Sequence, residues 1–236
     1  MKNILFLAII CILIGSCAGD TENTMTVTGN VKGLKKGTLY LQKVKNDQLL
    51  TIDSLIVDGN GNFEFKTELE SPEVFYLYLN KKDHNDVNDR ITFFGEPGTI
   101  RITTSWDTFD TKAVIEGSPS NKKLEEYKKN MSRFNTMDLE LVRASLDPKI
   151  RQDSIALDSL AQLGDRNILR GYLYSLNFAL NNKDSYVAPY IALTEVSDAN
   201  VKYLDSIHNS LSPEVADSKY GKELKDYIAE VKKTAQ

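Results

Sequence analysis

The fold of this protein is decided by the stretch IDSLIVDGNGNFEFK, residues 52–66. Two apolar segments in it flank the turn sequence Asp58-Gly59-Asn60-Gly61. Asp-Gly and Asn-Gly pairs tolerate the positive φ angles of a tight turn, and Phe63 and Phe65 alternate with polar neighbours. The stretch therefore predicts two β-strands, which we expect to pair with each other as an antiparallel hairpin.

Strand patterns continue on both sides of this stretch, from Met25 to about Ile115. Residues 74–79 place Phe75, Leu77 and Leu79 on one face of a strand, because side chains alternate between the two faces. Several short strands separated by turns are typical of two architectures. We therefore predict an antiparallel β-sandwich or an open barrel for this part of the chain.

The apolar period changes to that of helices after Ser118. Apolar residues then recur at steps of three and four, as they do on one side of a helix: Leu124, Tyr127, Met131, Phe134, Leu157, Leu160, Leu163, Leu169, Leu173 and Leu176. Asp147-Pro148 separates two long helices, and the second begins near Pro148 and ends at Asn181-Asn182. Shorter helices are expected over residues 185–194, 198–209 and 215–232.

The predicted fold class is α+β, with an N-terminal antiparallel β-sandwich or open barrel followed by an α-helical hairpin or bundle. The long helices between Asn121 and Leu180 have apolar seams that fit either a fold-back hairpin or a homodimer, and short connections favour folding back. The expected organisation is a signal peptide over residues 1–16, a lipidated tether over 17–24, a β domain over 25–117 and a helical domain over 118–236.

The first residues have the pattern of an export signal. Lys2 supplies a positive charge, and the apolar core over residues 4–14 is shorter than the ~20 residues that cross a bilayer. The run Ile14-Gly15-Ser16-Cys17 resembles the lipobox of bacterial lipoproteins. The resemblance implies cleavage between Ser16 and Cys17 and acylation of Cys17, whereas the alternative is an ordinary signal peptide with an incidental thiol.

The residues after Cys17 indicate where a lipid-anchored protein would reside. Ala18 stands where lipoproteins retained in the inner membrane usually have aspartate, which implies the outer membrane, with the protein facing the periplasm or the cell surface. Asp20 and Glu22 form an acidic tether that resembles the surface-export signals of Bacteroides-like bacteria. The first expected partner is therefore the membrane, through the N-terminal lipid.

Charge and cysteine content exclude several classes of function. With 29 basic and 33 acidic residues the formal net charge is −4, so the chain has no electrostatic reason to bind nucleic acid. Its two cysteines are Cys11, within the leader, and Cys17, the expected lipid carrier. The folded body therefore lacks the thiols needed for a disulfide, a Cys-x-x-Cys couple or a thiolate metal site.

The order of motifs in the β region resembles a known family. The matching elements are Val27-Thr28-Gly29, Gly37-Thr38-Leu39-Tyr40-Leu41, Ile52-Asp53-Ser54, Asp58-Gly59 through Phe63-Glu64-Phe65, Phe94-Gly95-Glu96-Pro97-Gly98 and Ile115-Glu116-Gly117-Ser118. They resemble the N-terminal domain of unknown function, DUF4369, that precedes a thioredoxin-like disulfide reductase domain in many Bacteroides-type lipoproteins. The helical half looks like the connector of those proteins, including Asp184-Ser185-Tyr186 and Ser218-Lys219-Tyr220-Gly221.

The resemblance implies an envelope lipoprotein rather than a redox enzyme. The chain ends at Gln236, where the thioredoxin-like domain of those relatives would begin, and no residue corresponds to their Cys-x-x-Cys. We therefore expect this protein to be without the thioredoxin-like domain and without its disulfide chemistry.

Other candidate sites favour structural roles. His84 and His208 lie far apart in the sequence, which argues against zinc. The oxygen-rich loop Asp83–Asp89 lacks the ligand order of an EF-hand, so a solvated loop is preferred to a calcium site. The pairs Asp53-Ser54, Asp153-Ser154, Asp158-Ser159 and Asp205-Ser206 have no accompanying base and are interpreted as caps or polar strand residues. We expect no metal, no cofactor and no catalytic activity.

Four aromatic residues are the best candidates for a binding face: Tyr40, Tyr76, Tyr78 and Trp106. If they share an exposed sheet face, they would stack on a glycan or pack on an envelope protein. The alternative is that the helices cover them. The preferred hypothesis is a non-catalytic binding or scaffolding lipoprotein. The alternatives are an accessory of a separate thioredoxin-like thiol-disulfide system and an unrecognised hydrolase or glycan-active protein.

Overall fold

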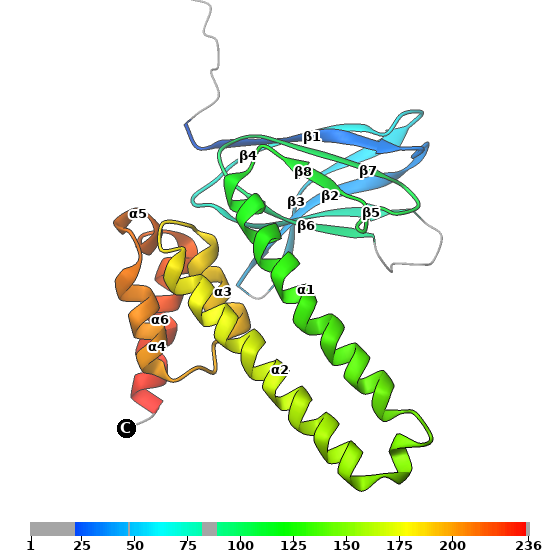
Figure 1. The fold of residues 1–236 in the computed structure, drawn as a ribbon. Coiled ribbons are helices and arrows are strands. Elements are labelled where there is room, and N and C mark those ends of the chain that lie inside the picture. Colours follow the sequence, from blue (N-terminus) through cyan, green and yellow to red (C-terminus); the bar gives the residue numbers. More distant parts are fainter. Residues whose placement is uncertain (1–21, 47, 82–88, 235–236) are drawn as a thin grey trace, which may run out of the picture.

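The computed structural model describes residues 22–46, 48–81 and 89–234, which form a β-sandwich followed by helices (Figure 1). The first sheet has the order β4 (Asn62–Glu68), β1 (Thr24–Lys32), β7 (Gly98–Ser105) and β8 (Val114–Glu116). The second sheet has the order β3 (Gln48–Asp58), β2 (Lys36–Lys45), β5 (Glu73–Asn80) and β6 (Arg90–Gly95). The predicted α+β class is confirmed, and of its two β architectures the sandwich is present, because the sheets do not close into a barrel.

The hairpin expected within residues 52–66 is wrong, although both of its strands are present. β3 pairs with β2 in the second sheet, whereas β4 pairs with β1 in the first, so the turn carries the chain from one sheet to the other. Gly59 adopts a φ of 94° in this turn, and a Cβ at Gly61 would lie 2.0 Å from the Val31 carbonyl oxygen. The crossing lets Val57 and Phe63 enter the same core from opposite sides.

One strand pair departs from the antiparallel expectation. β1 and β7 are parallel, with Met25 opposite Gly98 and Val27 opposite Ile100, whereas the other pairs among the described strands are antiparallel. The short turn after β6 moves the chain from the second sheet to the first, beside the beginning of β1. Both strands then run in the same direction, and alternate residues of both reach the core.

The sandwich core consists of inward side chains from both sheets. Phe75 of β5 and Phe93 of β6 stack with ring centroids 6.0 Å apart. The predicted alternation on β5 is confirmed, since Phe75, Leu77 and Leu79 are buried against this core. The remaining fully buried large residues that join them are Met25, Leu39, Leu41, Phe65, Ile100, Ile102 and Phe109.

The helices begin where the sequence period changes. α1 (Pro119–Ser145) is capped by the Ser118 hydroxyl, which accepts the Asn121 backbone N–H at 2.8 Å. α2 (Ser154–Asn181) begins later than the expected Pro148, after a short 3-10 turn over residues 150–152. The reason is the Asp153 carboxylate, which accepts the backbone N–H groups of residues 155 and 156 at 3.0 and 3.1 Å and so caps α2.

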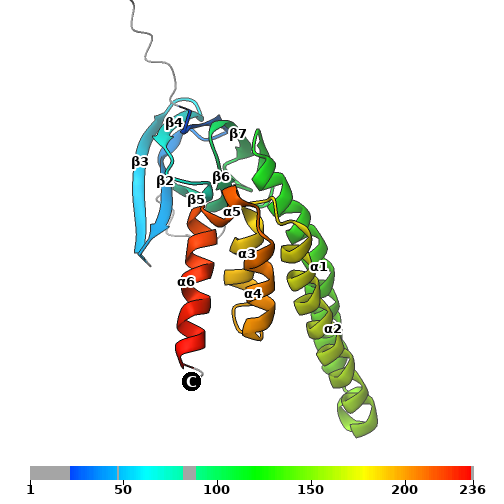
Figure 2. The same cartoon turned by 90° about the vertical axis from the view of Figure 1, so that its left-hand side faces the viewer.

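The remaining helices gather at the base of this pair. They are α3 (Val187–Glu195), α4 (Val201–Ser210), α5 (Pro213–Ala216) and α6 (Lys219–Thr234). The single final helix expected over residues 215–232 is divided into α5 and α6, because the chain turns at Asp217-Ser218. α1 and α2 form an arm that projects away from the sandwich, whereas α3, α4 and α6 stay near the second sheet (Figures 1 and 2). None of the helices in the described ranges has the length and apolar character of a membrane span.

Candidate functional site

The helical part covers one end of the outer face of the second sheet. Val74 of β5 and Phe94 of β6 are buried in an apolar cluster with residues from four helices: Leu124, Tyr127, Phe178, Val187, Ile191 and Tyr220. The Phe94 ring is fully buried and meets the rings of Tyr190 and Tyr220 edge-on, each with centroids 6.1 Å away. This interface cluster makes the sheet and the helices one packed unit.

Hydrogen bonds from strand backbones to helix side chains fix the same interface. The Phe94 backbone N–H donates to Asn121 Oδ1 at 3.0 Å, and the Ser118 hydroxyl donates to the Phe94 carbonyl at 2.9 Å. On the neighbouring strand, the Val74 N–H donates to the Tyr220 hydroxyl oxygen at 3.1 Å. Because buried backbone groups are costly to leave unpaired, these contacts fix where α1 and α6 meet the sheet.

A buried carboxylate joins β2, β5 and α6. The Glu73 side chain is only 4% exposed, and its two oxygens contact Lys43 Nζ at 2.6 Å and Lys219 Nζ at 2.5 Å. The backbone N–H of Lys219 also donates to the Ser71 hydroxyl oxygen at 3.0 Å. Glu73 therefore holds the start of α6 against the end of the second sheet.

We expect Glu73→Ala to lower the free energy of unfolding by about 3 kcal/mol, since removing one partner of a buried ion pair leaves uncompensated charge. Urea denaturation followed by circular dichroism measures the change. Asp217→Ala is the matched control, because Asp217 and Lys222 form an ion pair whose side chains are 82% and 60% exposed. Exposed pairs of this kind contribute about 0–1 kcal/mol. Equal effects of the two substitutions would contradict the role given to Glu73.

A cavity of about 510 Å³ opens beside Glu73, between the second sheet and helices α3 and α6. Three tyrosines from different elements contribute to its wall, namely Tyr76, Tyr190 and Tyr220. Its charged lining is balanced, with three lysines and three glutamates: Lys43, Lys45, Lys219, Glu70, Glu73 and Glu223. The cavity thus offers aromatic rings and hydrogen-bonding groups without a net charge.

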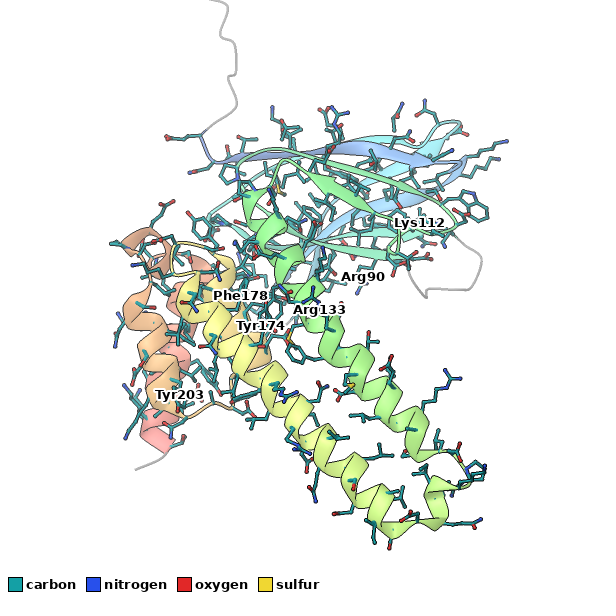
Figure 3. The ribbon with its side chains drawn as sticks, viewed as in Figure 1. Arg90, Lys112, Arg133, Tyr174, Phe178 and Tyr203 are labelled. Carbon is teal, nitrogen blue, oxygen red and sulfur yellow. The ribbon has the colours of Figure 1, made fainter. Side chains whose placement is uncertain are left out.

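An aromatic row on the sheet leads away from this cavity. Tyr40 and Tyr78 are cross-strand neighbours whose rings stack at 5.8 Å, and Arg90 is the next residue across the sheet. The Arg90 guanidinium lies 5.4 Å from the ring centre of Tyr78 and 5.6 Å from that of Tyr76. Arg90 projects from the sheet on the side of the helices (Figure 3). This arrangement is a cation–π contact that holds the tyrosine rings in place.

The structure brings together three of the four aromatic residues that the sequence suggested. Tyr40, Tyr76 and Tyr78 are each half-buried on one face of the second sheet. The helices reach Tyr76, which packs against the interface cluster, whereas Tyr40 and Tyr78 lie farther along the sheet. The helices thus cover the end of this face at Tyr76, as one interpretation expected. The end at Tyr40 and Tyr78 lies beyond them, as the other interpretation expected.

Trp106 does not belong to this face, so the expectation that it shares the face of the tyrosines is wrong. It follows β7 of the first sheet and is 48% exposed. Its ring lies against Gly33, where a Cβ would come within 2.7 Å of the indole. The separation arises because β7 and β5 belong to different sheets of the sandwich.

Several residues of the site have no recognisable signal in the sequence. Tyr190, Lys219 and Tyr220 are more than ninety positions away from the strands that they meet. Arg90 is one of many charged residues in the sequence. Only the strand register places its guanidinium over the rings of Tyr76 and Tyr78. The sole sequence signal was the alternation of aromatic residues along β5.

Burial makes the tyrosine hydroxyls of the interface harder to deprotonate. Desolvation raises the pKa of Tyr220 and of Tyr190 above the ordinary value of a tyrosine, so both hydroxyls stay neutral even in alkaline solution. On the arm side of the interface, burial similarly raises the pKa of Tyr127, which is hydrogen-bonded to Ser175 at 2.7 Å. These hydroxyls are suited to hydrogen bonding rather than to giving up a proton.

The other candidates from the sequence lie apart from this site. Asp153 caps α2, as interpreted, and His208 lies in α4. Ser16, Cys17 and His84 are outside the described residues, and of the loop 83–89 only Asp89 is described, in an ion pair with Lys81. In the described ranges, no three histidine, cysteine or acidic side chains gather in a way that would hold a metal ion.

A comparison with protein families gave a match to the β part of the chain. The model of a domain of unknown function (DUF4369) matches residues 25–124. The chain contains a DUF4369 domain. The DUF4369 match runs from Met25 in β1 through β8, the last of the described strands, and ends at Leu124, within α1 and in the interface cluster. Comparisons with curated proteins and with solved structures gave no match. The cavity thus lies between the DUF4369 domain and the helices that follow it.

Proposed function

We propose that this protein is a non-catalytic binding module of the bacterial cell envelope, held at the outer membrane by a lipid on Cys17. Its ligand site is the cavity between the DUF4369 domain and the helices. The observation that carries the proposal is the wall formed by Tyr76, Tyr190 and Tyr220 beside the Glu73 ion pairs. The proposed membrane attachment is supported by the resemblance of residues 14–17 to a lipobox.

The size and position of the cavity support ligand binding. Pockets for small molecules have volumes of about 300–1,000 Å³ and are often found where domains meet. The cavity, at about 510 Å³, lies within this range. Its walls are held by the interface cluster and by the hydrogen bond between Val74 and Tyr220, so the site is formed before a ligand arrives.

The chemistry of the wall favours a neutral glycan. Tyrosine combines an apolar ring with a polar hydroxyl, which suits the two sides of a sugar ring. The equal numbers of lysine and glutamate side chains give no net attraction for an ion. They do supply donors and acceptors for sugar hydroxyl groups.

The contacts of Glu73 support a binding role rather than hydrolysis. Glycosidases of the common type use two carboxyl groups on opposite sides of the scissile bond, one of them as a proton donor. Both oxygens of Glu73 are already engaged by lysines. Because both of its oxygens are in ion pairs, this carboxylate holds the cavity wall in place.

We expect Tyr76→Ala to weaken glycan binding about tenfold, because it removes an aromatic surface worth about 0.5–1.5 kcal/mol. The measurement is isothermal titration calorimetry of the purified protein against a panel of neutral di-, tri- and tetrasaccharides. Trp106→Ala is the matched control, since Trp106 is an exposed aromatic residue of the other sheet. A panel without any bound saccharide, or equal losses in both variants, would overturn the proposed ligand class.

A further inference from the structure

Three buried side-chain atoms lack a hydrogen-bond partner in the part of the chain that the structure describes: Gln42 Oε1, Asp89 Oδ1 and Asp110 Oδ1. Buried polar atoms are nearly always paired, so each exception needs an explanation. Asp89 Oδ1 has one, because it forms an ion pair with Lys81. Asp110 lies between β7 and β8 of the first sheet, whereas the cavity opens on the second. Gln42 belongs to β2 of that second sheet.

The strand register places Gln42 next to two residues of the cavity wall. Leu41 points into the sandwich core, so Gln42 lies on the opposite, outer face of the sheet. Its partner on β5 is Tyr76, and Val44 follows it on the same face of β2. Both Tyr76 and Val44 line the cavity. Gln42 is only 8% exposed, so its amide is buried beside this wall.

A β-bulge sets the direction of the Gln42 amide. The register of β2 with β3 shifts between Leu41 and Gln42, which leaves Ile52 as the extra residue of β3. The shift brings Thr51 opposite Gln42, and Gln42 Nε2 donates to Thr51 Oγ1 at 3.2 Å. Because the two polar atoms of an amide point in different directions, Oε1 is directed away from Thr51. Bulges beside functional sites re-aim side chains in this way.

The unpaired amide atom matches a hydroxyl group as its ligand. The Thr51 hydroxyl both donates and accepts, so it can bond either the nitrogen or the oxygen of Gln42. The spare atom is an acceptor in one orientation of the amide and a donor in the other. A ligand hydroxyl satisfies both, whereas an ammonium group only donates and a carboxylate only accepts.

We propose that the spare amide atom of Gln42 binds a hydroxyl group of the saccharide that packs on Tyr76. This role rests on the proposed function, since it needs a saccharide in the cavity. The last side-chain torsion of glutamine has a broad energy profile, so the amide can turn toward the ligand. An unpaired buried atom costs free energy in the protein without ligand, and the saccharide removes that cost. Gln42 thereby selects for a ligand with a hydroxyl at this position.

Gln42→Leu tests this role, because leucine is similar in size and has no amide. We expect the purified variant to bind saccharides about tenfold more weakly than the wild-type protein, since it loses a hydrogen bond to the ligand. The measurement is isothermal titration calorimetry with each neutral di-, tri- or tetrasaccharide that the wild-type protein binds. An unchanged affinity would overturn the role of Gln42 and leave the proposed function in place.

Gln162→Leu is the matched control. Gln162 is exposed on α2, and its Nε2 donates to Asp158 Oδ2 at 2.8 Å, so the substitution removes an amide with one protein partner away from the cavity. We expect its affinity for the same saccharides to equal that of the wild-type protein. An equal loss of affinity in both variants would count against a specific contact of Gln42.

Urea denaturation without ligand separates this role from a structural one. We expect Gln42→Leu to raise the urea midpoint by roughly 0.5 M, because the variant no longer buries an unpaired amide atom. A lower midpoint would show that the amide stabilises the fold instead, and would refute the inference. A wild-type protein that binds no saccharide of the panel would overturn the proposed function and this role together.

Discussion

Phe94→Ala is expected to lower the free energy of unfolding by about 3–5 kcal/mol, as for other buried phenylalanines. Phe94 is fully buried where the second sheet meets the helices, and its ring contacts those of Tyr190 and Tyr220. Truncation removes this apolar contact and leaves a cavity in the interface cluster. Urea denaturation followed by far-ultraviolet circular dichroism measures the loss.

A control and a second observable separate the interface from general core damage. Leu163→Ala removes a 41% exposed leucine on the arm and should cost less than about 1 kcal/mol. In Phe94→Ala the helical signal should be lost at a lower urea concentration than the fluorescence of Trp106, which reports on the first sheet. Coincident transitions with an unchanged midpoint would show that Phe94 does not join the two parts.

Cys17→Ala is expected to abolish attachment of the mature protein to the membrane. The proposed acylation would depend on the sulfur of Cys17, and stable anchoring needs more than one acyl chain. The variant should therefore appear in the soluble fraction or as an unprocessed precursor. The measurement is membrane fractionation of the producing bacterium, combined with metabolic labelling by a palmitate analogue.

Cys11→Ala serves as the control for this substitution. Cys11 lies within the apolar core of the expected leader, so its removal should leave lipid labelling and membrane attachment as in the parent chain. Persistent labelling of Cys17→Ala would refute the lipobox interpretation, and labelling lost equally in both variants would indicate a defect in export instead.

Local periodicity was sufficient to predict the fold class. Alternating side chains along residues 74–79 and the spacing of Leu124, Tyr127 and Met131 follow from the geometry of strands and helices, which each segment carries by itself. For the same reason, the beginning of the helical part near residue 118 could be placed from the sequence. The DUF4369 domain was also recognisable, because its turns and strands occur in a characteristic order.

Partners between segments were not predictable in the same way. The turn 58–61 was recognised, but a turn sequence does not state whether its two strands share a sheet. The preference of Val57 and Phe63 for a common core is satisfied either by a hairpin or by a crossing between sheets. The parallel pairing of β1 with β7 depended on this crossing and on the next one, after β6.

The sequence alone determined which side of each element is apolar, because that follows from the repeat of the backbone. Only the tertiary structure decided what covers each side. It placed Tyr220 on Val74, separated Trp106 from Tyr78, and left apolar side chains such as Leu139 and Ile155 exposed on the two long helices. The physical reason is that burial is a property of pairs of surfaces, and the surface that meets a given strand or helix is supplied by residues far away in the chain.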